Sequence, residues 1–177
     1  MSHEVALALG SSLGDGKATL RLATAALAVM PGLCLLRSSP IYATPPAGGV
    51  ARNPFVNAVV YGRTNLPPRA LLDRVKALEA RLGRSVSRRW ADRTLDIDLL
   101  LHGETVMDDG VLALPHPRMR ARSFVLVPLA SAWPEAHDPR DGARFASLPL
   151  AQVSLPIVGA LPNPPSPVRW NHPQESP

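Results

Sequence analysis

The segment RWADRTLDIDLLLHG, residues 89–103, carries two aspartates inside an apolar run that is otherwise typical of a buried β-strand. Asp96 and Asp98 are residues i and i+2, so in a strand they point to the same face with Cα atoms about 6–7 Å apart. Burying unpaired charge is costly, so these carboxylates either reach solvent or meet a cation. Such a pair can bind one metal ion, or two ions about 3.5–4 Å apart, and ligation by oxygen alone suits Mg²⁺ better than zinc. The alternatives are a solvated face or pairing with arginines.

Basic side chains flank the aspartate pair on both sides in the sequence. They are Arg84, Arg88, Arg89 and Arg93 before it, and His116, Arg118, Arg120 and Arg122 after it. Guanidinium groups bind phosphate oxygens through paired hydrogen bonds. Carboxylates for a metal beside cations for phosphate are typical of a metal–nucleotide site.

Two phenylalanines and an amide form a third candidate group. Phe55 and Asn57 share one face of a predicted strand, and Phe124 follows the second basic group. Each phenylalanine taken alone is better explained as a core residue. Two rings beside an amide are also suited to binding a flat heterocycle between them.

The segment GSSLGDGKAT, Gly10 to Thr19, lies between a predicted strand and a predicted helix, where a phosphate-binding P-loop would stand. The P-loop pattern requires four residues between the first Gly and the Gly-Lys pair, followed at once by Ser or Thr. Here five residues intervene, and Ala18 follows Lys17. A plain strand-to-helix turn is therefore the better interpretation.

Composition limits the class of protein. The chain has 177 residues, 46% of them hydrophobic, which suits one domain with a packed core. Its 19 basic and 14 acidic residues give a net charge of +5, which permits binding of nucleic acid or of a small polyanion such as a nucleotide. Cys34 is the only cysteine, which excludes a disulfide framework and a cysteine zinc site. The short apolar run at the N-terminus is not typical of a signal peptide, so we expect a cytoplasmic protein without a membrane span.

The hydrophobic pattern predicts strands and helices in mixed order. Strands are predicted at 4–10, 33–44, 55–64 and 94–103, a hairpin at 103–115, and helices at about 20–30, 67–82 and 123–134. Pro40 marks an edge or a bulge in the second strand. Without the strict alternation of a parallel sheet, this order favours an α+β sandwich with a mainly antiparallel sheet and helices packed on it. Residues 1–155 are predicted to form this domain, and 156–177 a Pro-rich, flexible tail.

The segments RWADRTLDIDLLLHG and LPHPRMRARSFVLVPL together closely resemble the 6-hydroxymethyl-7,8-dihydropterin pyrophosphokinase family of folate biosynthesis. The segments ALGSSLGD, SSPIYATPP and FVNAVV occur in the order expected for that family, so the resemblance covers about residues 4 to 155. It implies a ferredoxin-like α+β fold. It also implies an ATP-dependent diphosphotransferase that transfers pyrophosphate from ATP to the hydroxymethyl group of the pterin and releases AMP.

For the nucleotide, the resemblance implies two Mg²⁺ ions that are bound by Asp96 and Asp98 and bridge the phosphates of ATP. The residues that it implies as phosphate contacts are Arg84, Arg93, His116 and Arg122. Arg84 and Arg93 join the two aspartates as catalytic residues. The remaining residues implied for the nucleotide site or its loop are Glu79 and Trp90.

For the pterin, the resemblance implies Phe55 and Phe124 as a stacking pair. Asn57 and the backbone from Thr44 through Pro45 to Ala47 would bind the polar edge of the ring, and Asp96 also contacts the substrate. The segments PPAGG and GRSVSRRWADR would be mobile loops that close over the substrates. No general base is evident, which fits chemistry that depends on positioning and charge neutralisation.

The chain departs from the family pattern at three places. Ser12 stands where the family usually has Asn, and Ala91-Asp92 replaces the usual Gly-Pro beside Arg93. The loop after Gly83-Arg84 is one residue short, so the second loop arginine of the family has no clean match, and Arg88 is a candidate substitute. The departure at Ser12 bears on the floor of the pterin site, and the other two bear on loop closure. None of them bears on the class of reaction.

A rival interpretation is a basic nucleic-acid-binding domain on a similar sheet, with Phe55 and Tyr61 as stacking aromatics. The aromatic-rich strand of RNA-binding sheets is absent, and this interpretation leaves the aspartate pair unexplained. We therefore expect a monomer whose partners are ATP and the pterin, without nucleic acid or membrane.

Overall fold

The computed structural model describes residues 1–45, 53–83, 94–162 and 164. The strands are β1 (His3–Ser11), β2 (Leu33–Ser38), β3 (Pro40–Thr44), β4 (Phe55–Thr64), β5 (Asp96–His102), β6 (Met107–Asp108), β7 (Ala113–Leu114) and β8 (Ile157–Ala160). The helices are α1 (Gly16–Ala28), α2 (Pro68–Arg81) and α3 (Ser123–Ala132), with 3₁₀ turns at Met119–Ala121, Phe145–Ser147 and Pro149–Ala151. The predicted helices and the predicted hairpin at 103–115 are confirmed.

One antiparallel sheet forms the centre of the fold. Its strand order is β5-β1-β4-β3-β8, and β2 pairs with β4 beside β3. The predicted strand at 33–44 is divided at Ser39, whose backbone and side chain both bond to Val59 of β4. Pro40 has no N–H to give to a ladder and is the first residue of β3. The edge or bulge predicted at this proline is a break between β2 and β3, and β3 itself lies between β4 and β8.

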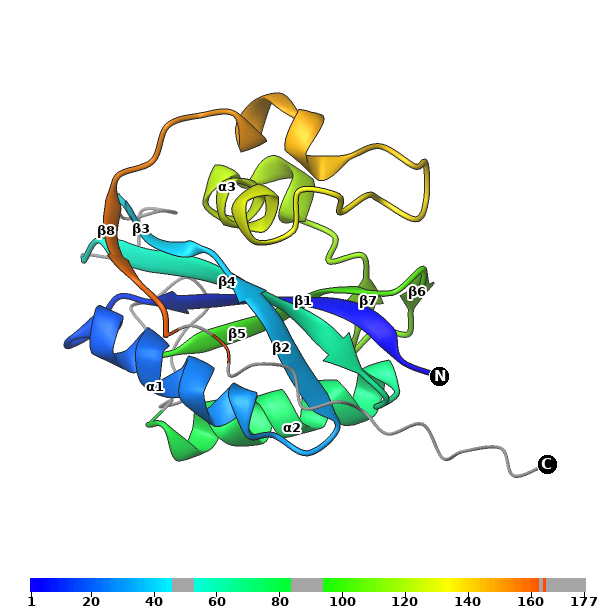
Figure 1. Cartoon of the computed structure of the whole chain (residues 1–177), viewed down its shortest axis with the longest axis horizontal. Helices are drawn as coiled ribbons and strands as arrows, with labels where there is room; N and C mark the ends of the chain where they lie inside the picture. The colour runs from blue at the N-terminus through cyan, green and yellow to red at the C-terminus, as the bar shows by residue number, and fades with distance from the viewer. Residues whose placement is uncertain (46–52, 84–93, 163, 165–177) are drawn as a thin grey trace.

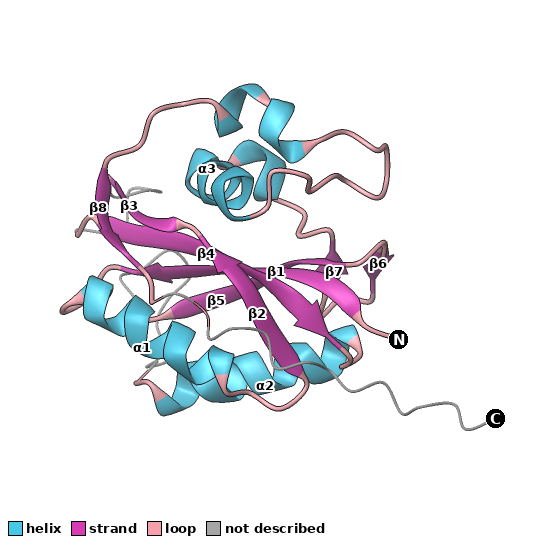
Figure 2. Cartoon of the chain, in the orientation of Figure 1, coloured by secondary structure: helices cyan, strands magenta, loops and turns pink. Residues whose placement is uncertain are grey.

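The helices cover the sheet in two layers. Helices α1 and α2 pack on one face, and α3 packs on the other (Figures 1 and 2). Strand β4 shows the alternation behind this arrangement: Ala58 and Val60 lie in the core under α1 and α2, whereas Val59 and Tyr61 lie in the core under α3. The predicted α+β class with a mainly antiparallel sheet is confirmed.

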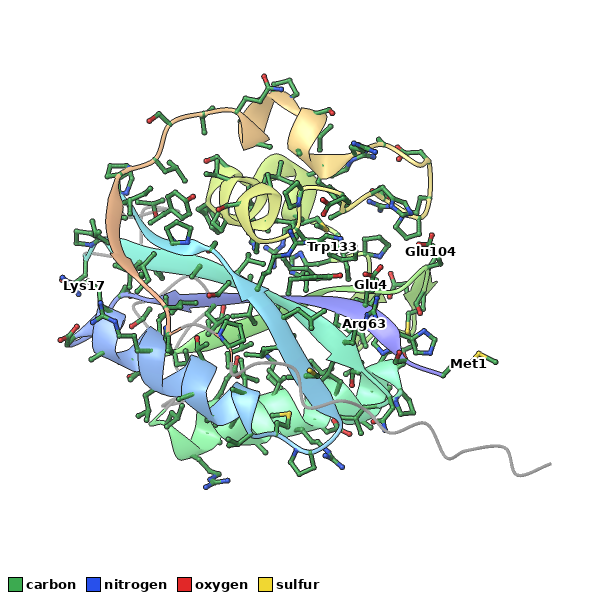
Figure 3. All side chains as sticks on the ribbon, viewed as in Figure 1. Met1, Glu4, Lys17, Arg63, Glu104 and Trp133 are labelled. Carbon is green, nitrogen blue, oxygen red and sulfur yellow. The ribbon has the colours of Figure 1, made fainter. Side chains whose placement is uncertain are left out.

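The far end of α3 is fixed to the sheet through aromatic packing. Trp133, which follows the helix, lies between α3 and the sheet (Figure 3). It stacks on Tyr61 with ring centroids 4.6 Å apart. The Tyr61 hydroxyl donates a short hydrogen bond to Glu4, and burial is the main reason that the pKa of Tyr61 is raised to about 12. This anchor lies at the C-terminal end of α3, opposite to the first residues of the helix.

The beginning of the predicted tail belongs to the sheet, which corrects the boundary at residue 155. Ile157–Ala160 forms β8 and pairs with β3, and Arg21 of α1 donates to the carbonyl of Ala160. Because prolines surround the apolar run IVGA, the sequence predicted a tail here rather than a strand. Residues 163 and 165–177 lie outside the described residues, so the rest of the tail stays a prediction. No helix in the described ranges is long and apolar enough to cross a bilayer.

Candidate active site

The strand register aligns the candidate residues across three neighbouring strands. Gly10 of β1 is paired with Asn57 of β4 on one side and with Asp96 of β5 on the other. Residues directly opposite in adjacent strands share a face, so the amide of Asn57 and the carboxylate of Asp96 project from the face of the sheet that α3 covers. Gly10 has no side chain between them. The carboxylates predicted to bind a metal and the amide predicted to bind a flat heterocycle therefore lie on one face of the sheet.

Asp98 lies two residues after Asp96 on the same face of β5, and it faces a histidine. The Nε2 atom of His116 is 3.9 Å from Oδ2 of Asp98, and the two side chains are 17% and 33% exposed. The backbone N–H of His116 donates to the carbonyl of Leu100, two residues after Asp98 in β5. One strand thus positions both the carboxylate and the imidazole.

The electrostatic surroundings keep His116 neutral at pH 7. Burial is the largest cause of its lowered pKa, the cations of Arg122 and Arg118 act in the same direction, and Asp98 opposes them. Nδ1 of His116 accepts a hydrogen bond from the backbone N–H of Arg118, which assigns the proton of the neutral ring to Nε2. A neutral N–H donor is therefore directed toward the aspartate pair.

The amide of Asn57 is oriented by a threonine on the neighbouring strand. Its Nδ2 atom donates to Oγ1 of Thr44 over 2.9 Å, and both residues are buried. Phe55 is paired with Thr44 in the β3–β4 ladder and lies half-buried on the same face, since it is two residues before Asn57. Pro45 follows Thr44 and is exposed.

Phe124 approaches this face from the beginning of α3. It is half-buried and packs against the core under that helix. The guanidinium carbon of Arg122 lies 5.5 Å from the centroid of the Phe124 ring, a cation–π contact. The structure thus brings Arg122 and Phe124 together, beside the loop that carries His116.

Glu79 lies in a different layer from the other candidates. Its side chain is buried under β5, where it contacts Lys76 and the backbone of Ile97. Four further predicted site residues, Ala47, Arg84, Trp90 and Arg93, lie outside the described residues, and so does each predicted closing loop except for its first residue.

The carboxylates fit the metal that the sequence predicted. Within residues 1–45, 53–83, 94–162 and 164, no group of three or more metal-ligating side chains is present. Asp96 and Asp98 therefore offer two carboxylates, which is unlike a zinc site. Mg²⁺ is commonly held by one or two carboxylates together with water and substrate phosphates, so the donor set suits Mg²⁺ bound with a nucleotide.

The turn after β1 is not built as a P-loop. Oδ1 of Asp15 caps α1 by accepting from the N–H of Ala18 over 3.0 Å. A carboxylate therefore stands at the helix N-terminus, where a P-loop would hold a phosphate. Lys17 lies at the outer end of α1 (Figure 3). The interpretation as a plain turn is supported.

Two residues of the site were not singled out by the sequence. Gly10 was considered only as the start of a P-loop, although an antiparallel pairing of 3–11 with 55–64 would have placed it beside Asn57. Lys76 is one helical turn before Glu79, a spacing that signals an ion pair but not its contact with β5. The rival proposal for Tyr61 is wrong, because this ring is buried under Trp133 and cannot stack on a nucleic acid base.

Comparison with known proteins agrees with this geometry. The family model described as 7,8-dihydro-6-hydroxymethylpterin-pyrophosphokinase (HPPK) matches residues 6–134. The chain is 40% identical over 162 residues to a 2-amino-4-hydroxy-6-hydroxymethyldihydropteridine pyrophosphokinase of Pseudomonas aeruginosa, covering 92% of this chain and 99% of the relative. It is 43% identical over 129 residues to the protein of the same description from Methylorubrum extorquens, covering 73% and 82%.

A solved structure supports the fold. The crystal structure of Plasmodium falciparum HPPK-DHPS with pteroate superposes with a TM-score of 0.64 at 16% identity over 84% of this chain. The chain spans only 42% of the length of that protein. The extent of the family match and the identity to the bacterial relatives show that the chain belongs to the 7,8-dihydro-6-hydroxymethylpterin-pyrophosphokinase family.

Proposed function

We propose that this protein transfers the β,γ-diphosphoryl group of ATP to the hydroxymethyl oxygen of 6-hydroxymethyl-7,8-dihydropterin and releases AMP. The observation that carries the proposal is the row Asn57–Gly10–Asp96 across three strands. The reaction requires a flat ring with a polar edge to lie next to a metal-bound triphosphate. In this row, a buried amide and a carboxylate project from one face on either side of a residue without a side chain.

The pterin would lie against Asn57 between the rings of Phe55 and Phe124. A side-chain amide offers both a donor and an acceptor, as does the edge of a pterin ring. Because Nδ2 of Asn57 already donates to Thr44, the amide is held in one orientation, with Oδ1 directed toward Gly10. Preorganised polar groups of this kind give specificity without a further cost in side-chain entropy. The backbone from Thr44 through Pro45 to Ala47 is proposed to complete this recognition.

Asp96 and Asp98 would hold two Mg²⁺ ions together with oxygens of ATP. When bound, the ions neutralise phosphate charge and align the attacking and leaving oxygens. The protein contributes two carboxylates at fixed spacing on a strand, with water and phosphate oxygens completing the coordination. Asp96 lies nearest to the proposed pterin position, since it shares a row with Asn57.

Phosphate binding is assigned to cations around the aspartate pair. Neutral His116 offers Nε2–H as a hydrogen-bond donor, and Arg122 supplies a permanent positive charge beside it. Arg84 and Arg93 are proposed as further phosphate contacts, and Glu79 and Trp90 as parts of the nucleotide site, in agreement with the family motifs. Chemistry of this type depends mainly on positioning and on stabilisation of charge, and no side chain needs to act as a nucleophile.

In the proposed step, a bond forms between the hydroxymethyl oxygen and the β-phosphorus of ATP. The bond between that phosphorus and the α,β-bridging oxygen breaks, so AMP departs with the bridging oxygen. The hydroxyl proton is released to solvent. The products are AMP and a pterin that carries two phosphates.

The experiment that tests the proposal follows the β-phosphorus. Purified protein, Mg²⁺, 6-hydroxymethyl-7,8-dihydropterin and ATP labelled with ³²P at the β-position would be incubated, and the products separated by chromatography. AMP and labelled pterin diphosphate should form in equal amounts, and only when the pterin is present. Formation of ADP in step with a singly phosphorylated pterin, or no nucleotide turnover that depends on the pterin, would overturn the proposal.

A further inference from the structure

Ile97, the residue between the two aspartates, has its backbone polar groups occupied by side chains of α2 rather than by a strand. Its N–H donates to Oε1 of Glu79, and its carbonyl oxygen accepts from Nζ of Lys76 over 2.8 Å. β5 is the terminal strand of the sheet as described, and in an antiparallel ladder the polar groups of successive residues point to opposite sides. The backbone groups of Asp96 and Asp98 therefore point to β1, and those of Ile97 point to α2.

The two side chains of α2 also bind each other. Nζ of Lys76 donates to Oε1 of Glu79 over 2.8 Å, so the ammonium of Lys76, the carboxylate of Glu79 and the backbone of Ile97 are hydrogen-bonded to one another. The Glu79 side chain is 1% exposed, whereas that of Lys76 is 38% exposed. A buried carboxylate that lost its donors would incur a large desolvation cost, so the set is held together strongly.

The position of these contacts bears on the metal ligands. The N–H of Ile97 belongs to the peptide unit shared with Asp96, and its carbonyl belongs to the unit shared with Asp98. Rotation of either unit would change the direction of the adjoining aspartate side chain. Two peptide units that are fixed from α2 therefore fix the angle between the two carboxylates from behind, without contact with their oxygens.

We infer that Lys76 and Glu79 are positioning residues, which set the direction of the Asp96 and Asp98 carboxylates for the divalent cations by clamping the backbone of Ile97. The inference rests on the proposed function for the identity of the cations. It concerns the chain's own geometry and needs no contact between Lys76 or Glu79 and a substrate. It gives Lys76 a role that the family motifs did not assign.

The test uses Lys76→Met, which removes the donor and keeps most of the aliphatic stem, and Glu79→Gln, which keeps an acceptor and removes the charge. Free Mn²⁺ would be measured by electron paramagnetic resonance with protein and α,β-methylene ATP, whose α–β bridge is not cleaved. Loss of partners that orient metal ligands typically lowers metal affinity by about 10- to 100-fold. We expect a rise in the Mn²⁺ Kd of at least roughly tenfold for Lys76→Met and a smaller rise for Glu79→Gln. The Mg²⁺ concentration for half-maximal turnover should rise in parallel, with pterin KM unchanged.

Matched controls on the same helix separate this role from charge and stability. Asp73→Asn removes one negative charge at an exposed position, and Arg69→Met removes one positive charge that pairs with Asp109. Neither should change the Mn²⁺ affinity. The double variant Lys76→Met/Glu79→Gln should have about the same Mn²⁺ Kd as the single variant with the higher Kd, because both residues act through one clamp.

Two further results would decide against the inference. Variants that lose thermal stability but keep wild-type Mn²⁺ affinity and Mg²⁺ dependence would reduce the clamp to a structural ion pair. If Glu79→Gln weakened binding of metal-free ATP while Lys76→Met had no effect on Mn²⁺, Glu79 would serve the nucleotide site by direct contact alone, and the clamp would have no positioning role. Absence of pterin-dependent AMP formation in the wild type would overturn the proposed function alone, since the Mn²⁺ measurements would still decide the role of the clamp.

Discussion

The Oδ1 atom of Asn57 lies 3.2 Å from the position that a Cβ atom on Gly10 would occupy. This distance is shorter than ordinary van der Waals contact, so Gly10→Ala would displace the amide of Asn57 and its hydrogen bond to Thr44. Loss of one such hydrogen bond to a substrate costs about 0.5–1.5 kcal/mol. We expect pterin KM to rise roughly two- to twelvefold with ATP KM unchanged, measured by steady-state kinetics.

A matched control for Gly10→Ala is Gly159→Ala. Gly159 lies on β8, at the opposite edge of the sheet from β5, where an added Cβ would meet mainly the end of the Arg21 side chain. This variant should leave both KM values unchanged. Equal effects of the two substitutions would show that the response is a general loss of sheet stability.

Asp98→Asn should reduce turnover while leaving the fold intact. The substitution removes an anionic Mg²⁺ ligand, and it also relieves repulsion between two carboxylates on one strand face when no metal is bound. Loss of a hydrogen-bond partner that orients a metal ligand lowers metal affinity or activity by about 10- to 100-fold. Loss of the ligand itself should therefore lower kcat by at least about a hundredfold. The thermal midpoint should stay equal or rise. A variant that unfolds instead would show that Asp98 serves as a structural partner of His116.

Phe124→Ala should weaken pterin binding. Stacking of a flat base on an aromatic ring is worth about 1–3 kcal/mol, so the pterin Kd should rise roughly five- to hundredfold in a calorimetric titration. ATP affinity should change much less, because on the nucleotide side the substitution removes the cation–π contact with Arg122 and leaves its charge in place. Phe124→Tyr retains the ring and should restore most of the affinity. An unchanged pterin Kd in folded Phe124→Ala would leave Phe124 as a core residue only.

Much of the fold could be predicted because its signals are local. The strand at 55–64 was predicted with the bounds of β4, and alternation along it correctly placed Phe55, Asn57, Val59 and Tyr61 on one face. The helix at 68–81 follows from its prolines and its apolar spacing. That Asp96 and Asp98 share one face of a strand was also a local inference from their i, i+2 spacing. The structure confirms that both belong to β5.

What could not be predicted depends on pairing between distant segments. No local signal assigns Ile157–Ala160 to an edge beside β3, since prolines around the run favour a tail. The contact of Glu79 and Lys76 with Ile97 likewise requires knowing that α2 packs against β5. The neighbours of Gly10 follow only from the register of β1 with two other strands.

The buried imidazole of His102 predicts a loss of stability in mild acid. Burial is the main cause of its lowered pKa, and the nearby His3 ring, 4.9 Å away between centroids, acts in the same direction. Its Nε2 atom lies 2.9 Å from the carbonyl of Leu66, so the neutral ring donates there. Below about pH 6.5 the unfolded chain takes up a proton that the folded chain does not. The free energy of unfolding should therefore be highest above pH 6.5 and decrease as the pH falls toward the pKa of His102 in the folded chain. For one histidine the decrease is at most about 1.4 kcal/mol per pH unit.

The check is chemical denaturation of the wild type and of His102→Gln between pH 7.5 and pH 5. Glutamine retains an N–H donor for Leu66 but does not titrate, so this variant should be less stable at pH 7.5 and lose less stability on acidification. His116, whose pKa burial also lowers, acts in the same direction, so the double variant His102→Gln/His116→Gln should show a flatter profile still. Parallel profiles of the wild type and His102→Gln would contradict the prediction, because they would mean that His102 takes up its proton equally in the folded and unfolded chains.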